Sequence, residues 1–186
     1  IFRRADLPHV LVGARKFYER MEIRDILSYF RLIVNPADEM SFARAIGAPR
    51  RGVGDKTVQQ ITGLARQSGL TVLDMAKEWG EDGRSKIRRS VLAFCQLVEE
   101  ARSSAVRRTA PHALCEFIMD RSGYRAALES EAEKERGKSG GKTDAERRLD
   151  NLDSLIDDLS RAWEEGSEAG DESDALAWLR DFLDRA

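Results

Sequence analysis

Cysteine and histidine are scarce in this sequence, whose 186 residues include only Cys95, Cys115, His9 and His112. The cysteines form no Cys-x-x-Cys pair, and neither histidine has the spacing to a second donor that a zinc site requires. Both cysteines lie among apolar neighbours, which favours buried, reduced thiols. The sequence therefore predicts no structural metal site.

Long apolar runs and common catalytic motifs are also missing. No segment approaches the roughly 18–20 apolar residues of a membrane span, and the first residues lack the apolar core of a signal peptide. There is no Gly-x-x-x-x-Gly-Lys-Ser/Thr phosphate loop, no Gly-x-Gly-x-x-Gly turn after a strand and no Gly-x-Ser-x-Gly elbow. The neighbouring carboxylates Asp157 and Asp158 lie on the polar face of a predicted helix, where solvation is their expected role. We therefore predict no catalytic residue in this chain.

Charge is divided unevenly along the chain, although the net charge is only −2. Residues 1–110 carry 20 Lys and Arg against 13 Asp and Glu, a balance of +7. Residues 111–186 carry 11 Lys and Arg against 20 Asp and Glu, a balance of −9. A basic first half suits a polyanionic partner on one side of the protein, although charged residues usually only solvate a surface.

Apolar residues recur with helical spacing through most of the chain. Within residues 21–34, for example, Ile23, Ile26 and Phe30 lie on one face of a helix. Proline near the start and glycine at the end delimit another helix over residues 111–123. Further helices are predicted at residues 38–47, 55–69, 71–79, 86–102, 145–163 and 174–186. We predict an all-α fold whose apolar stripes form the core.

Two charged, glycine-containing stretches interrupt this pattern, and we predict that residues 129–144 and 164–174 are mobile loops. The one strand candidate is Val10–Val12, which has no partner strand in the chain. A lone strand cannot satisfy its own backbone hydrogen-bonding groups. We therefore expect this orphan strand to belong to a sheet whose other strands lie elsewhere, or to a frayed edge.

The segment APRRGVGDKTVQQI, residues 48–61, contains two glycines one residue apart between two predicted helices. Glycine accepts positive φ and has no Cβ, so backbone N–H groups of such a turn can approach a phosphate closely. The helix that begins near Asp55 directs its partial positive charge and its free N–H groups at the same place. A helix-hairpin-helix element of this kind grips a nucleic-acid backbone without selecting a sequence.

The residues predicted to contact DNA are Arg51, Gly52, Val53, Gly54, Lys56 and Thr57. Val53 is expected to pack inward and fix the hairpin, and Thr57 supplies a hydroxyl donor. We expect both Arg51 and Lys56 to be exposed cations. The alternative is an ordinary turn between helices, in which the glycines serve only geometry and Asp55 is the N-cap.

A longer stretch around this hairpin resembles the UvrD/PcrA/Rep family of superfamily 1 DNA helicases. The family carries a run of the form GG-x-x-F-[FY]-x-R-x-E-I-[KR]-D-x-L-[AS]-Y-[LF]-R-L-x-x-N-P, followed further on by P-x-RGIG-x-x-T. The matching residues here are Gly13, Phe17, Tyr18, Arg20, Glu22, Ile23, Asp25, Leu27, Tyr29, Arg31, Leu32, Asn35, Pro36, Pro49, Arg51, Gly52, Gly54 and Thr57. Weaker similarity continues at residues 120–128 and 148–159. Two departures are Ala14, where the family has a second glycine, and Val53, where it has isoleucine.

The resemblance implies a place within a larger enzyme, which agrees with a chain that begins without Met. Family members fold into four subdomains, 1A, 1B, 2A and 2B, and this chain resembles the all-helical 2B. Residues 1–20 would then be a remnant of 2A with the hinge, and residues 21–186 would be 2B. This assignment would also explain the orphan strand.

The resemblance also implies roles for individual residues. The family's hairpin contact with duplex DNA falls on Gly52, Val53, Gly54, Lys56 and Thr57, with Arg51 beside them. The run from Phe17 to Arg31 corresponds to motif IVa at the 2A–2B junction. The residues expected to hold this hinge, rather than to do chemistry, are Phe17, Arg20, Glu22, Asp25 and Arg31. The motifs that bind ATP and Mg are absent, so these cofactors are implied for the whole enzyme and none for this chain.

We therefore interpret the chain as the 2B part of a cytoplasmic, ATP-dependent 3′-to-5′ DNA helicase, with no membrane contact. It would contact duplex DNA at a single-strand/double-strand junction and regulate unwinding, without hydrolysing ATP itself. Its implied partners are the duplex, the remaining helicase subdomains and accessory repair or replication proteins. The alternative is a helical protein-interaction or autoregulatory module with no direct DNA contact, and the acidic residues 129–174 fit that role.

Overall fold

The computed structural model describes residues 16–136, 141–168 and 174–186. Within these ranges the chain forms α-helices joined by turns and contains no strand, which confirms the predicted all-α fold. The predicted strand Val10–Val12 lies outside the described residues. The helices are α2 (Met21–Val34), α3 (Glu39–Gly47), α4 (Asp55–Ser68), α5 (Val72–Glu81), α6 (Lys86–Val106), α7 (Pro111–Ser122), α8 (Tyr124–Glu135), α9 (Asp144–Glu168) and α10 (Ala175–Leu183).

Local sequence signals explain several helix ends. The side chains of Asp38, Thr71 and Ser85 each accept a hydrogen bond from a backbone N–H in the first turn of α3, α5 and α6, respectively. Such caps satisfy amides that have no partner within the helix. Gly69 and Gly123 end α4 and α7 in the left-handed conformation, with φ of 72° and 77°. Because these signals are local, the predicted boundaries of these helices agree closely with the structure.

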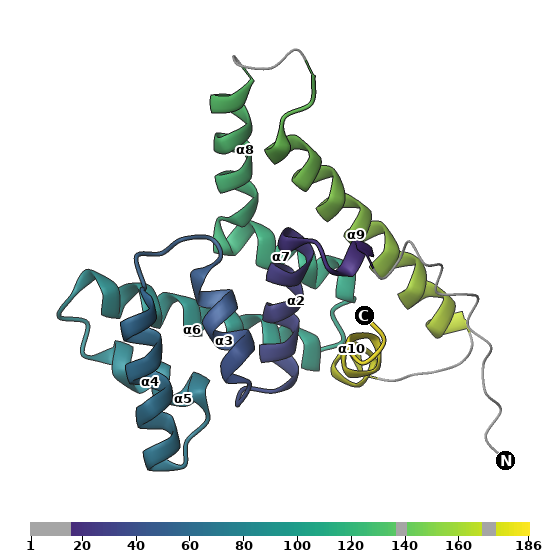
Figure 1. Ribbon diagram of the computed structural model, residues 1–186. Helices are drawn as coiled ribbons and strands as arrows, with labels where there is room; N and C mark the ends of the chain where they lie inside the picture. Colours follow the sequence, from purple (N-terminus) through teal and green to yellow (C-terminus); the bar gives the residue numbers. More distant parts are fainter. Residues whose placement is uncertain (1–15, 137–140, 169–173) are drawn as a thin grey trace, which may run out of the picture.

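Helix α2 lies at the centre of the fold (Figure 1) and packs against α3, α6, α7, α9 and α10. Its predicted apolar stripe is buried, and Ile23, Ile26 and Phe30 are fully inaccessible. Burial also extends around the helix to Asp25 and Tyr29. Buried polar groups require internal hydrogen-bond partners. The partners of these two side chains hold several of the helices in place.

Helices α8 and α9 pack against each other and form an arm (Figure 1). Helix α8 and the first part of α9 extend away from the other helices, whereas α9 also packs against α7 and α2. The predicted loop at residues 129–144 is wrong over residues 129–135, which continue α8. Leu128 and Ala132, four residues apart, are both buried in the arm. Two apolar residues make too narrow a stripe to stand out in so charged a sequence, but packing against a second helix is enough to hold the segment helical.

The second predicted loop, residues 164–174, is wrong over residues 164–168, which belong to α9. Contact with α10 explains this extension. The ring of Trp163 lies edge-on to that of Trp178 in α10, with 5.7 Å between the ring centroids. Because Trp178 lies beyond the predicted loop, in α10, the acidic sequence of the loop itself does not reveal this contact.

Gly80 brings α5 close to α6. A Cβ atom at residue 80 would lie 2.9 Å from the backbone nitrogen of Leu92 and 3.1 Å from the carbonyl oxygen of Arg88. We expect Gly80→Ala to lower the free energy of unfolding by about 1–3 kcal/mol, the usual cost of overpacking, as measured by urea denaturation. The control is Gly63→Ala in α4, where a Cβ meets nothing within 4 Å. An equal loss of stability in both variants would contradict close packing at Gly80.

Candidate nucleic-acid interface

The glycine-rich hairpin connects the end of α3 to the start of α4 (Figure 1). Gly52 has a φ of 75°, in the left-handed region that glycine favours. Gly54, rather than Asp55, is the N-cap of α4, and no side chain caps the helix there. A Cβ built at either glycine meets no atom within 4 Å. The described part of the chain therefore leaves this stretch of backbone open to a close approach from outside.

The backbone amides of this hairpin include several free donors. Those of residues 52–56 form no hydrogen bond with any residue that the structure describes. The next two amides, of Thr57 and Val58, donate to the carbonyl oxygen of Gly54 at 2.9 and 3.2 Å and so begin α4. Free amides at the positive end of a helix form a favourable site for an anion.

Three exposed cations lie around this backbone: Arg50, Lys56 and Lys86. None of them forms an ion pair within the described ranges. A hollow of about 440 Å³ separates the hairpin from the start of α6 and is lined by Arg50, Arg51, Gly52, Lys86 and Ile87. Unpaired cations beside free amides raise the local positive potential and attract a polyanion.

Arg51 differs from these cations, because the prediction that it is exposed is wrong. Its side chain is half-buried, and its Nη1 atom donates to three carbonyl oxygens. The acceptors and distances are Ala45 at 3.1 Å, Ile46 at 3.2 Å and Pro49 at 2.9 Å. The positive charge of Arg51 is therefore directed at the end of α3 and the start of the hairpin.

Tyr29 of α2 completes this arrangement. Its hydroxyl oxygen accepts a hydrogen bond from Nη2 of Arg51 at 2.6 Å and donates one to the carbonyl oxygen of Ala48 at 2.5 Å. Burial raises the pKa of Tyr29, and the nearby Arg51 charge partly opposes that rise. Val53 packs partly buried against the hydrophobic core, as expected. Arg51 and Tyr29 thus anchor the hairpin to the rest of the protein, while Gly52 and Gly54 remain exposed.

Two of the predicted hinge residues, Glu22 and Asp25, are buried near the start of α2, with 4% and 7% exposure. The carboxylate of Asp25 accepts hydrogen bonds from Nε of Arg44 at 2.8 Å and from the hydroxyl of Tyr124 at 2.7 Å. Burial, together with the charge of Asp25, raises the pKa of Tyr124 and keeps its hydroxyl protonated. This carboxylate therefore joins α2 to both α3 and α8.

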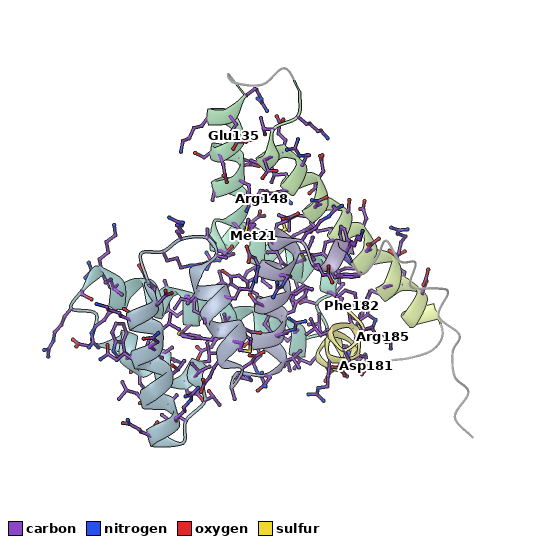
Figure 2. All side chains as sticks on the ribbon, viewed as in Figure 1. Met21, Glu135, Arg148, Asp181, Phe182 and Arg185 are labelled. Carbon is purple, nitrogen blue, oxygen red and sulfur yellow. The ribbon has the colours of Figure 1, made fainter. Side chains whose placement is uncertain are left out.

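Glu22 joins α2 to α9 in a similar way. It accepts a hydrogen bond from Nδ2 of Asn151 at 2.6 Å and lies 3.9 Å from Nε of Arg148. Arg20, a third predicted hinge residue, donates to the side-chain oxygen of Asn151. Figure 2 shows Arg148 on α9 near Met21 at the start of α2, and the two residues line one hollow. These contacts fix the base of the arm against α2.

The last two predicted hinge residues have different surroundings. Phe17 lies in a helical turn ahead of α2, edge-on to Tyr18, with 5.3 Å between the ring centroids. The ring of Tyr18 in turn packs against that of Phe182 in α10, with 5.9 Å between the ring centroids. Figure 2 shows where Phe182 lies on that helix. Arg31 lies in the last turn of α2, where its charge complements the helix dipole, and it has no ion-pair partner in the described ranges.

Several residues of these networks were missed by the sequence analysis, namely Tyr29, Arg44, Tyr124, Arg148 and Asn151. Their partners lie far away in the sequence, for example 99 residues for Tyr124 and Asp25. One available signal was the family similarity at Tyr29 and over residues 120–128 and 148–159, which contain Tyr124, Arg148 and Asn151. The other was a set of polar side chains on the otherwise apolar α2. That pattern indicates internal partners but does not identify them.

No helix in the described ranges is long and apolar enough to cross a bilayer. Among the same residues, no group of three His, Cys, Asp or Glu side chains could hold a metal ion. Both cysteines are free and buried, as predicted, and burial raises the pKa of Cys95 to about 12.

Comparisons with known proteins identify the family of this chain. The family described as "UvrD-like helicase C-terminal domain" matches residues 1–186. The protein named ATP-dependent DNA helicase PcrA from Staphylococcus aureus is 31% identical over 159 residues, which cover 83% of this chain and 20% of that protein. The protein of the same name from Staphylococcus epidermidis is 31% identical over 156 residues, with the same coverage. The chain thus spans about one fifth of the length of these curated relatives. It belongs to the family of UvrD-like helicase C-terminal domains, within the UvrD/PcrA group of superfamily 1 helicases.

Proposed function

We propose that this chain is the 2B part of an ATP-dependent DNA helicase and that its hairpin holds the backbone of duplex DNA. The observation that carries this proposal is the open face at Gly52 and Gly54, with free amides at the positive end of α4. The phosphate contacts are assigned to residues 52–54 through their backbone and to Lys56 and Thr57 through their side chains.

This arrangement suits a phosphate better than a base edge. Backbone amides and lysine bind any phosphate equally well and so carry no sequence information. Lys56 is exposed and unpaired within the described ranges, so no internal ion pair has to break when DNA binds. A helicase must move along any sequence, and a contact that ignores the bases allows it to do so.

The family also suggests a function for the complete enzyme, which we include in the proposal. The complete enzyme would unwind DNA in the 3′-to-5′ direction, with ATP and Mg bound outside this chain, in the cytoplasm. The chain would regulate that activity by meeting duplex DNA at a single-strand/double-strand junction. Residues 1–20 would link it to 2A, and the networks around Glu22 and Asp25 would keep the start of α2 rigid at that hinge.

A protein-interaction role is the second candidate, and the arm favours it. Helix α9 exposes acidic side chains along its length, including Asp144, Asp150, Asp153 and Asp157. Asp144, Asp150 and Asp153 pair with Arg147, Lys142 and Arg125, which neutralises part of this charge. Acidic side chains still outnumber basic ones along α9, so the surface suits a basic region of an accessory repair or replication protein better than DNA. The two functions occupy different elements, because the arm is formed by α8 and α9 whereas the hairpin lies between α3 and α4 (Figure 1).

The proposed contact is tested by titrating the chain into a fluorescent hairpin DNA that has a single-stranded tail, over a series of salt concentrations. We expect Lys56→Gln to weaken binding and to lower the slope of log K against log salt by about 0.9, the value for one lost phosphate contact. The control is Lys134→Gln, which removes an exposed lysine from α8. It should leave both affinity and slope unchanged.

The outcomes separate the two functions. The hairpin contact is supported if the unchanged chain prefers duplex over single-stranded DNA and only Lys56→Gln loses duplex affinity. Equal binding by the parent and by both variants would show that the hairpin is only a turn. If the unchanged chain does not bind duplex and the Lys56→Gln variant still binds a basic partner protein, the protein-interaction role is favoured.

A further inference from the structure

We propose that Arg51 is a positioning residue for the DNA-contacting hairpin and does not itself bind a phosphate. This inference rests on the proposed function, since it assigns a role within the same surface. Its basis is the full set of contacts that the guanidinium makes inside the protein. The adjacent Arg50 is exposed and has no ion-pair partner in the described ranges, so the two arginines have different roles.

The guanidinium of Arg51 lies at the C-terminal ends of two helices. Its Nη1 atom donates to the carbonyl oxygens of Ala45 and Ile46 in the last turn of α3. Its Nη2 atom lies 3.5 Å from the carbonyl oxygen of Ser122, the last residue of α7. Helix C-termini carry partial negative charge and unpaired carbonyl oxygens, so a cation is stabilised there. Arg51 therefore has its counter-charge within the fold.

Aromatic rings cover the same guanidinium. Its carbon atom lies 5.4 Å from the ring centroid of Phe94 in α6 and 5.9 Å from that of Tyr29 in α2. Phe94 is only 2% exposed, so this contact lies at the edge of the core. Stacking of this kind favours the planar guanidinium over the compact ammonium of lysine.

Arg51 and Tyr29 together form a clamp that joins the hairpin to four helices. Arg51 contacts α2, α3, α6 and α7, and Tyr29 holds the carbonyl oxygen of Ala48 on the other side of Pro49. A phosphate site built from backbone amides works only if those amides keep their relative positions. We infer that the clamp supplies this order, and that DNA affinity depends on Arg51 through the shape of the hairpin.

Arg51→Lys separates position from charge, because lysine keeps the charge but lacks the planar fork. If Arg51 positions the hairpin, this variant should bind duplex about fivefold more weakly, the effect of losing one or two hydrogen bonds, with the parental salt slope. Hydrogen exchange should also become faster at the amides of Ala48, Thr57 and Val58. These amides are hydrogen-bonded at the two ends of the hairpin and report its order without DNA.

Tyr29→Phe is the second variant, and it keeps the test decisive if Arg51→Lys does not fold. It removes one hydroxyl, leaves the charge unchanged and should produce a smaller loss of affinity and faster exchange at the same amides. The comparison variant is Lys56→Gln, the proposed phosphate contact, which should lower the salt slope and leave amide exchange unchanged.

Two results would overturn the positioning role. In the first, Arg51→Lys binds duplex as tightly as the unchanged chain, and Arg51→Gln lowers the slope of log K against log salt by about 0.9. This combination is the signature of a direct phosphate contact. The second is parental amide exchange in both Arg51→Lys and Tyr29→Phe. A parent chain that does not bind duplex at low salt would overturn the proposed function instead, and the exchange data would still decide whether the clamp orders the hairpin.

Discussion

Asp25→Ala should lower the free energy of unfolding by about 3 kcal/mol, because it removes the carboxylate shared by a partly buried arginine and a buried hydroxyl. Asp25 is 7% exposed and accepts hydrogen bonds from both Arg44 and Tyr124. Without the carboxylate, the Tyr124 hydroxyl has no equivalent acceptor, and Arg44 keeps only its hydrogen bond to the carbonyl oxygen of Met21. Helix α2 thus loses its polar link to α8 and one of its two links to α3. Urea denaturation, followed by circular dichroism, measures the change.

Two further variants make this prediction specific. Asp157→Ala removes an exposed carboxylate from α9 and should change stability by less than about 0.5 kcal/mol, as most surface substitutions do. Tyr124→Phe removes only one of the two hydrogen bonds to Asp25 and should cost about 1–2 kcal/mol. A loss below 1 kcal/mol in Asp25→Ala would mean that solvent replaces the carboxylate and that the network does not hold the helices together.

Gly54→Ala should weaken duplex binding about tenfold, equivalent to losing one charge-assisted hydrogen bond of roughly 1.4 kcal/mol. A Cβ at this position meets no atom of the described chain within 4 Å, so the added methyl group does not disturb the fold by contact. It would project into the space that we assign to a phosphate. Because alanine is a poorer N-cap than glycine, a small loss of stability of about 0.5–1 kcal/mol is also expected.

The comparison of affinity with stability decides whether the glycines serve function or only geometry. Gly63→Ala, in the middle of α4, also adds a Cβ that meets nothing within 4 Å. This control should bind duplex as the parent does and be slightly more stable, since alanine favours helix. If Gly54→Ala also binds as the parent does, no backbone group near residue 54 lies against DNA.

Most of the secondary structure was predictable, because its causes are local. The apolar spacing of α2, the side-chain caps at Asp38 and Thr71 and the terminal glycines at residues 69 and 123 all act within a few residues. The errors occurred where stability comes from packing against another helix rather than from the segment's own residues. Residues 129–135 have few apolar side chains, and they are helical because α8 packs against α9.

The candidate site was predictable in part for the same reason. Two glycines, nearby cations and the start of a helix are adjacent in the sequence and therefore adjacent in space. The different roles of Arg50 and Arg51 were not predictable, since both precede the same glycines. Only the fold places Tyr29, Phe94 and the end of α7 around one of them.

The sequence by itself determined the all-α class, the position of the glycine hairpin and the family, because helical periodicity, turn residues and motif spacing are properties of neighbouring residues. The tertiary structure alone decided which charges are buried and which are free. Asp25 and Arg51 make their contacts inside the protein, whereas Lys56 remains exposed. The physical reason is that desolvation and pairing depend on what surrounds a charge in space, and those surroundings come from distant segments that fold together.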